Sequence, residues 1–327
     1  MKRRDVWAAT AVLAAVGRES AVAAEARPLR LGVLSPSDDN DETRQGSAFL
    51  DELARHGYVL GRNLTIERRS SHQAGMDAAA SALAALKVDV IYAIDGTAAA
   101  LAAKRATSSI PIVFRSANPV AFGLVSSLAR PGGNLTGISI QGPAITTKEM
   151  EAMAEALGSL RSLAYIHAAD SPSYPWHQNF VAASTAAAKA LGVRIEYHPA
   201  SGFAAYEPLI QELARRKVDA AQLMPPTPAF TLTESEYERV GSLFLRHRLP
   251  AIGPPTSGFL LRIEIAEDLM LRRLAYLVAR IAGGTKPADL PVEEFSSLRL
   301  ILNAKVARAL GIVLPRSILL RADEVIS

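Results

Sequence analysis

The chain has 327 residues, with 36 basic and 32 acidic side chains, six histidines and no cysteine. The absence of cysteine excludes a disulfide framework, a thiolate metal site, a cysteine nucleophile and a lipid-carrying cysteine. A nucleic-acid-binding protein concentrates Lys and Arg on one face, whereas here both signs of charge are interspersed, so nucleic acid is not an expected partner.

The first 26 residues have the pattern of a signal peptide. A basic start over 2–4 precedes a short apolar segment over 6–16, and small side chains follow around Ala23 to Ala26, where we expect cleavage. The apolar segment is shorter than the roughly 20 residues that a membrane-spanning helix needs. We therefore expect export to the periplasm, with the ordinary secretory route and the twin-arginine route both open.

Strand and helix patterns alternate along the first half of the mature chain. Short apolar runs predict strands, and longer runs with apolar residues three and four apart predict helices. The expected strands cover 29–35, 63–70, 88–94 and 110–116, and the expected helices cover 43–57, 74–87 and 98–106. Strands that alternate with helices at this spacing predict parallel pairing in a sheet covered on both faces.

The same alternation begins again at residue 161. Segments with an expected strand cover 161–175, 193–198, 218–226 and 249–255, and the expected helices between them cover 179–192, 206–217 and 235–248. Two successive cycles in about 300 mature residues predict an α/β protein with two Rossmann-like lobes, each built on a parallel sheet.

Ligands of open α/β sheets bind beyond the carboxyl ends of the strands, where loops and helix amino-termini converge. In this chain those ends carry hydroxyl, amide, carboxyl and imidazole groups. The candidate ligand-binding residues are Ser35, Ser37, Asp95, Gly96, Thr97, Ser116, Asn118, His167, Asp170, Tyr174, Thr227 and Thr256.

Two of these candidates have a structural alternative. Thr97 stands before the helix over 98–106, so its hydroxyl either only caps that helix or helps a ligand anion to bind at the free backbone N–H groups. His167 stands at an expected strand end, where a satisfied polar contact and ligand recognition are both open.

Motifs for catalysis, metal binding and cofactor binding are missing from the sequence. The histidines have no metal-ligand spacing, and the acidic run over 38–42 lacks the spacing of a calcium loop. The segment over 137–142 does not have its second glycine at the spacing of a nucleophile elbow, and neither a dinucleotide-binding nor a phosphate-loop glycine pattern occurs. We therefore expect a binding protein, not an enzyme, with no catalytic residue, no metal and no cofactor.

Several segments, in order along the chain, carry a family signature. They are DGTAAALAA over 95–103, IPIVFRSANPVAFGLVSSLARPGGNLTGIS over 110–139, GGTKPADLPVE over 283–293 and LPRSILLRADEVI over 314–326. Together they resemble the exported substrate-binding proteins of ABC transporters, in the branch that includes tryptophan- and tyrosine-uptake-type proteins. The resemblance implies a type I periplasmic-binding-protein fold, in which two lobes close on a small molecule.

The chain departs from that pattern at three places. Asn118 stands before Pro119 where the family usually has Asp, which replaces a carboxylate by a neutral amide. The segment SGFLLRIEIAED over 257–268 replaces small or aromatic polar residues. The segment HAADSPSYPWHQ over 167–178 carries Tyr174 and Trp176, whose rings either stack on a ligand or pack within the protein.

The resemblance also implies how the lobes divide and what they do. Because such proteins cross between lobes more than once, we expect one lobe from 27–142 with 257–285, the other from 143–256 with 286–327, and a hinge near 137–143. The expected function is a monomeric periplasmic receptor that delivers a small organic solute to ABC permease subunits at the inner membrane. An exported α/β hydrolase-like enzyme and a ligand-sensing subunit of a membrane receptor are the alternatives.

Overall fold

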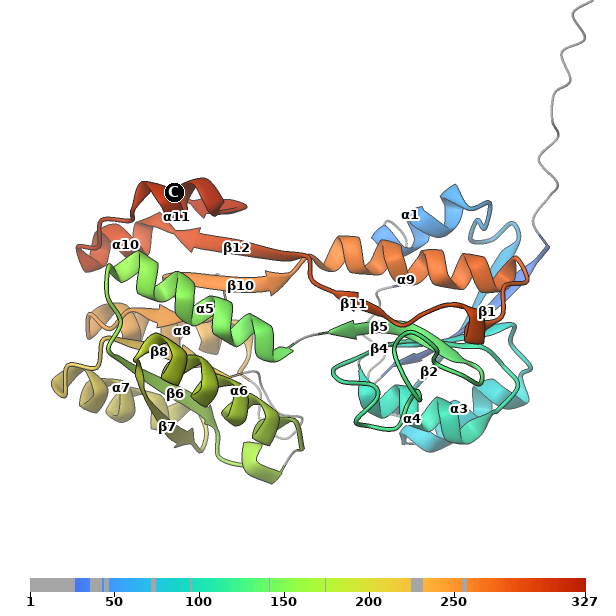
Figure 1. Ribbon diagram of the computed structural model, residues 1–327, viewed down its shortest axis with the longest axis horizontal. Helices are drawn as coiled ribbons and strands as arrows, with labels where there is room; N and C mark the ends of the chain where they lie inside the picture. Colours follow the sequence, from blue (N-terminus) through green and yellow to red (C-terminus); the bar gives the residue numbers. More distant parts are fainter. Residues whose placement is uncertain are drawn as a thin grey trace, which may run out of the picture.

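The computed structural model of the protein describes residues 27–35, 43, 47–71, 75–94, 96–140, 142–173, 175–224, 232–254 and 258–327, with the backbone alone at 142–144, 175 and 176. The described residues form two α/β lobes that lie side by side along the long axis of the molecule (Figure 1). The chain passes between the lobes through a narrow middle region, where β5 leads to α5, β10 leads to α9 and β11 leads to β12.

In the described part of the chain, the first lobe holds a six-stranded sheet in the order β11-β5-β4-β3-β1-β2, with every pair parallel. Its strands are β1 (Leu29–Ser35), β2 (Leu64–Ser70), β3 (Val90–Ala93), β4 (Ile112–Ser116), β5 (Leu135–Ile140) and β11 (Glu293–Phe295). Its helices are α1 (Ala48–Arg55), α3 (Met76–Ala85), α4 (Thr97–Ala106) and α9 (Glu267–Ala282), with a short 3₁₀ turn η3 (Pro287–Asp289). The strands expected over 29–116 are confirmed.

The helices cover both faces of this sheet, as a parallel sheet requires. On one face α3 and α4 bury mainly alanine side chains against the strands, and small side chains let these helices approach closely. On the other face lie α1 and α9.

In the second lobe, the described strands form a seven-stranded sheet in the order β13-β12-β10-β9-β8-β6-β7. The strands are β6 (Ser162–Ala168), β7 (Arg194–Ala200), β8 (Ala220–Leu223), β9 (Ala251–Ile252), β10 (Leu261–Ile265), β12 (Leu298–Asn303) and β13 (Glu324–Ile326). The helices are α5 (Gly142–Leu157), α6 (Pro175–Leu191), α7 (Tyr206–Arg215), α8 (Glu234–Arg246), α10 (Ala304–Leu310) and α11 (Arg316–Arg321), with 3₁₀ turns η1 (Ser171–Ser173) and η2 (Phe203–Ala205). On one face α5, α6, α10 and α11 share a core, and α7 and α8 cover the other face.

One pair of the second sheet departs from parallel pairing, because β10 and β12 are antiparallel. The cause is the path of the chain. β10 carries the chain out of the second lobe toward α9, and β12 brings it back from β11, so two neighbouring strands run in opposite directions.

Strand pairing also differs from the expected lobe boundaries at two segments. β10, expected with the first lobe, belongs to the second sheet, and β11, expected with the second lobe, pairs with β5 of the first sheet. We therefore propose lobe boundaries at the three connections β5–α5, β10–α9 and β11–β12 of the described chain.

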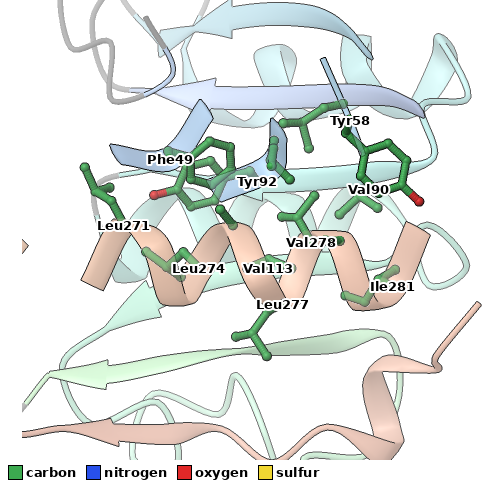
Figure 2. Close-up of a cluster of buried hydrophobic side chains, with 14 of the residues drawn as sticks. Phe49, Tyr58, Val90, Tyr92, Val113, Leu271, Leu274, Leu277, Val278 and Ile281 are labelled. Atoms are coloured by element: carbon green, nitrogen blue, oxygen red, sulfur yellow. The ribbon is translucent and has the colours of Figure 1, made fainter. Parts of the chain in front are cut away.

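Helix α9 completes the core of the first lobe although it lies more than 100 residues after β5. Its buried residues recur three and four apart, which forms one apolar stripe along the helix. Figure 2 shows side chains of that stripe, among them Leu274 and Val278, facing the stacked rings of Phe49 and Tyr92. The two ring centroids are 4.7 Å apart. The first lobe is therefore held together by a segment that reaches it only after the chain has traversed most of the second lobe.

Candidate functional site

The carboxyl edge of the first sheet carries two pairs of serine hydroxyl groups, which are separated by β3. Ser116 of β4 pairs in register with Ser139 of β5, and Ser35 of β1 pairs with Ser70 of β2. All four serines are buried. Two predicted site residues, Ser35 and Ser116, therefore lie on one edge of one sheet.

Thr97 lies beside this edge, but it is not the helix cap that the sequence predicts. The N-cap residue of α4 is Gly96, with a φ of 85°, and Thr97 is the first residue of the helix. The hydroxyl of Thr97 lies 2.7 Å from Oγ of Ser116. Two predicted site residues, Thr97 and Ser116, are therefore in contact, and we call Thr97, Ser116 and Ser139 the hydroxyl row.

Asn118 shapes the turn that follows β4. Its φ of 54° lies in the left-handed region, which Asn adopts more readily than most residues. Its Oδ1 accepts a hydrogen bond of 3.3 Å from the backbone N–H of Ala121. The residue is exposed, so its amide has a structural role in the turn and remains accessible from outside.

In the second lobe, His167 is buried at the end of β6. Its Nδ1 lies 2.8 Å from the carbonyl oxygen of Ala168, so this nitrogen carries the proton and donates. The His177 ring lies 5.0 Å from the His167 ring, edge to face. Burial, and secondarily the nearby His167, lower the pKa of His177. The sequence pointed to His167 but not to this pair.

The remaining predicted site residues divide into two groups. The half-buried Asp170 accepts, through its carbonyl oxygen, a 2.7 Å hydrogen bond from the Ser173 hydroxyl, which holds the turn after β6. The others lie outside the described residues, and their role stays a prediction: Ser37, Asp95, Tyr174, Thr227 and Thr256. Trp176, whose ring was left open between stacking and packing, has no described side chain.

A cavity of about 610 Å³ lies in the second lobe, between the first turns of α5 and α8, the carboxyl end of β8, and β10. A smaller cavity of about 140 Å³ shares the wall residues Ile145 and Ile265 with it and is also lined by Ile140 and Phe295 of the first sheet. The larger cavity therefore lies next to the region where the chain crosses between lobes. Of the predicted site residues that the structure describes, none lines it.

Glu149 of α5 is the buried acid of this cavity. Its Oε2 accepts a 2.6 Å hydrogen bond from Nε2 of Gln222, and its Oε1 accepts one of 3.3 Å from the backbone N–H of Ile263. Burial raises the pKa of Glu149 to about 7, against the opposite effects of the Ile263 N–H and the positive charge of Arg262. A carboxyl that titrates near neutrality thus joins α5, β8 and β10 at one point.

Local sequence places the other polar wall residues. α8 begins after Thr233, whose hydroxyl accepts from the N–H of Glu236 while the Glu236 carboxylate accepts from the N–H of Thr233. This capping box starts the helix so that Glu234 and Tyr237 reach the cavity. From β6, Tyr165 lines the same cavity, and burial raises the pKa of its hydroxyl, which keeps it neutral.

Two features of the sequence point to this cavity, although the prediction of site residues at the carboxyl ends of strands did not include it. Glu149 is one helical turn after the buried Thr146 and one before the buried Met153, so a carboxyl occupies the inward face of α5. Arg262 and Ile263, which line the cavity, belong to the SGFLLRIEIAED segment that departs from the family pattern.

A model of a protein family described as ABC transporter substrate binding protein matches residues 33–326. A curated relative, the tyrosine-binding protein of Clostridioides difficile (strain R20291), is 38% identical over 102 residues, which make up 30% of this chain and 29% of that protein. The match thus spans less than a third of the curated relative's length.

Two solved structures cover nearly the whole chain. A conserved domain protein from Vibrio cholerae O1 biovar El Tor is 26% identical, with a TM-score of 0.73 over 91% of this chain and 100% of its own. An ABC domain from Streptococcus pneumoniae, crystallised with L-Trp, is 24% identical, with a TM-score of 0.72 over the same shares. The predicted type I periplasmic-binding-protein fold, with two α/β lobes, is confirmed.

Proposed function

The chain belongs to the family of ABC transporter substrate binding proteins, and from this premise we propose that it is a periplasmic receptor that binds a small organic solute between its lobes and delivers it to an ABC permease. Its resemblance to the tryptophan- and tyrosine-uptake-type branch is confirmed by the same matches. Family members are substrate-binding proteins, not enzymes, so the protein acts by binding and release.

One observation carries the proposal. The 610 Å³ cavity, large enough for a small organic molecule, lies beside the β5–α5 and β10–α9 connections, where a change in lobe orientation alters its walls. The hydroxyl row of the first sheet provides polar groups on the other lobe. Closure of the lobes over the solute would create the surface that a permease distinguishes from the empty receptor.

Aromatic amino acids come first among the solutes to test, since one relative is named for tyrosine and another was crystallised with L-Trp. The test is a thermal-shift screen of the chain from residue 27 onward against amino acids, nucleosides, aromatic acids and sugars, followed by calorimetry. A solute at a hundred times its Kd stabilises the folded state by about 2.7 kcal/mol. If no solute in these classes shifts the melting temperature, the receptor proposal loses its support.

Export and a monomeric state are part of the proposal. Residues 1–26 lie outside the described residues, and no described helix has the length and hydropathy needed to cross a membrane. The mass of the protein recovered from the periplasm tests cleavage near Ala23 to Ala26, and light scattering of the same sample tests the monomer.

We expect Thr97→Val and Asn118→Gly to weaken binding of the solute that the screen identifies. Glycine tolerates the left-handed φ of residue 118, so this variant removes the amide without backbone strain. Loss of one hydrogen-bond partner that the bound solute buries costs about 1–3 kcal/mol, which corresponds to roughly five-fold to over a hundred-fold in Kd. Calorimetry measures the change, and unaltered affinity in both variants would exclude the hydroxyl row and its turn from the site.

A further inference from the structure

Gln222 has a buried acceptor atom without a protein donor. The residue is 2% exposed and lines the cavity, and its Nε2 donates to Glu149. Its Oε1 is buried and has no hydrogen-bond partner among the residues that the structure describes. Buried acceptors in proteins are nearly always paired. A donor group on a bound solute would complete the hydrogen bonding of this amide.

Charge in the cavity favours a positive solute group. Among the described lining residues, Glu149, Glu234 and Glu264 carry carboxylates, and Arg262 carries the opposing charge. Nε of Arg262 lies 3.6 Å from Oε2 of Glu264, beyond hydrogen-bond distance, and the positive charge of Arg262 also acts on Glu149. The three carboxylates outnumber the one guanidinium, so a cation in the cavity is favoured, and Glu149 lies one hydrogen bond away from the open acceptor of Gln222.

The rest of the wall is apolar. Phe180 of α6, Met224 after β8 and Leu232 before α8 line the cavity. Burial of a hydrocarbon or aromatic group against such side chains is favourable in proportion to the apolar area removed from water. The cavity therefore combines a polar, negative corner with an apolar wall.

We infer that the Glu149–Gln222 pair recognises a primary ammonium group on the solute. Gln222 Oε1 accepts a hydrogen bond from the ammonium, Glu149 supplies the countercharge, and the apolar body of the solute packs against Phe180, Met224 and Leu232. The inference rests on the proposed receptor function and assigns the chemical class of its solute. A free arylalkylamine and an amino acid share this ammonium group.

Protonation of Glu149 abolishes the site. A neutral carboxyl donates through its O–H, so Gln222 turns its amide to accept that proton and presents its N–H groups to the cavity. The countercharge and the open acceptor are then lost together. The titratable and charged groups that face Glu149 across the cavity are Arg262 and Glu264 of β10, Tyr165 of β6, and Glu234 and Tyr237 of α8.

The test is calorimetry of the mature chain with three probes of similar size: 2-phenylethylamine, L-phenylalanine and 3-phenylpropanoate. We expect the amine to bind at pH 8 and the carboxylate to bind at least tenfold more weakly. Because the pKa of Glu149 is about 7, amine affinity should fall roughly tenfold from pH 8 to pH 6 and roughly a hundredfold from pH 8 to pH 5. Affinity for L-phenylalanine equal to or above that for the amine would identify an amino acid as the source of the ammonium.

Matched variants separate the role of the Glu149–Gln222 pair from general effects of charge on binding. Glu149→Gln keeps an acceptor for Ile263 and a donor for Gln222, so it should weaken amine binding at pH 8 at least tenfold and remove its pH dependence. Glu155→Gln is the control, because Glu155 is on the same helix but pairs with Arg321 instead of lining the cavity. It should bind the amine as the unaltered chain does.

Three results would overturn the inference: no binding of either amine-bearing probe, amine affinity equal at pH 5 and pH 8, or unaltered amine binding by Glu149→Gln. If the Glu149 variant does not fold, the pH dependence of amine binding by the unaltered chain tests the inference. Binding of a solute without an ammonium group, together with failure of both amine-bearing probes, would overturn this inference alone and leave the receptor function standing. Failure of every solute class would remove the receptor function as well.

Discussion

Replacing Gly137 by alanine is expected to destabilise the protein by about 3 kcal/mol or more, or to prevent folding. Gly137 pairs in register with Phe114 in the middle of the first sheet. A Cβ atom at position 137 would overlap the backbone carbonyl oxygen of Phe114 and approach its carbonyl carbon and its amide nitrogen to 2.8 Å. Backbone atoms in a sheet cannot move aside as a side chain does, so the strands must separate.

The matched control is Gly283→Ala at the end of α9. Its φ of −76° suits any residue, and the nearest atom to an added Cβ lies at 3.4 Å, an ordinary contact. We expect a change within about 0.5 kcal/mol. Urea unfolding of both variants measures the free energies, and near-equal values would mean that β4 and β5 do not approach as closely as the structure has them.

Replacing Glu149 by glutamine is expected to change the pH dependence of stability. The folded protein holds a proton on Glu149 more tightly than the unfolded chain does, because burial raises its pKa from 4.5 to about 7. This contribution to stability is fully present below pH 4.5 and is lost as the pH rises through about 7. The change corresponds to roughly 3 kcal/mol, since one pKa unit is about 1.4 kcal/mol.

The variant lacks this titration, so its stability relative to the unaltered chain should rise by about 2–3 kcal/mol between pH 5 and pH 8.5. Urea unfolding at both pH values measures the difference. Glu155→Gln again serves as the control, since its carboxylate pairs with Arg321 at the surface of α5. Parallel pH profiles for the unaltered chain and Glu149→Gln would contradict the assignment of a buried, proton-binding carboxyl.

For the candidate site, the sequence predicted which residues lie at the carboxyl edge of a single sheet. The register of β1, β2, β4 and β5 follows from parallel pairing, so Ser35 and Ser116 were placed correctly on one edge. The same reasoning does not find Glu149 or Gln222. Glu149 is within a helix and Gln222 is within a strand, and they meet only because α5 packs across β8 and β10.

The sequence by itself determined the strands and helices over 29–116 and 161–255 and their alternation. Periodicity and glycine positions are local properties, and two α/β cycles with short connections allow few arrangements other than two parallel sheets. The same local properties led to a wrong assignment of Thr97 as the helix cap. Gly96 occupies the cap position, and the Thr97 hydroxyl forms a hydrogen bond with Ser116.

Only the tertiary structure decided which sheet each late segment joins and where the buried acid lies. β10 and β11 are short apolar or mixed runs that fit either lobe by pattern, and their partners β12 and β5 are chosen by the path of the chain through the crossings. The proton affinity of Glu149 likewise depends on desolvation by surrounding elements that are distant in sequence, and this quantity exists only once those elements have packed.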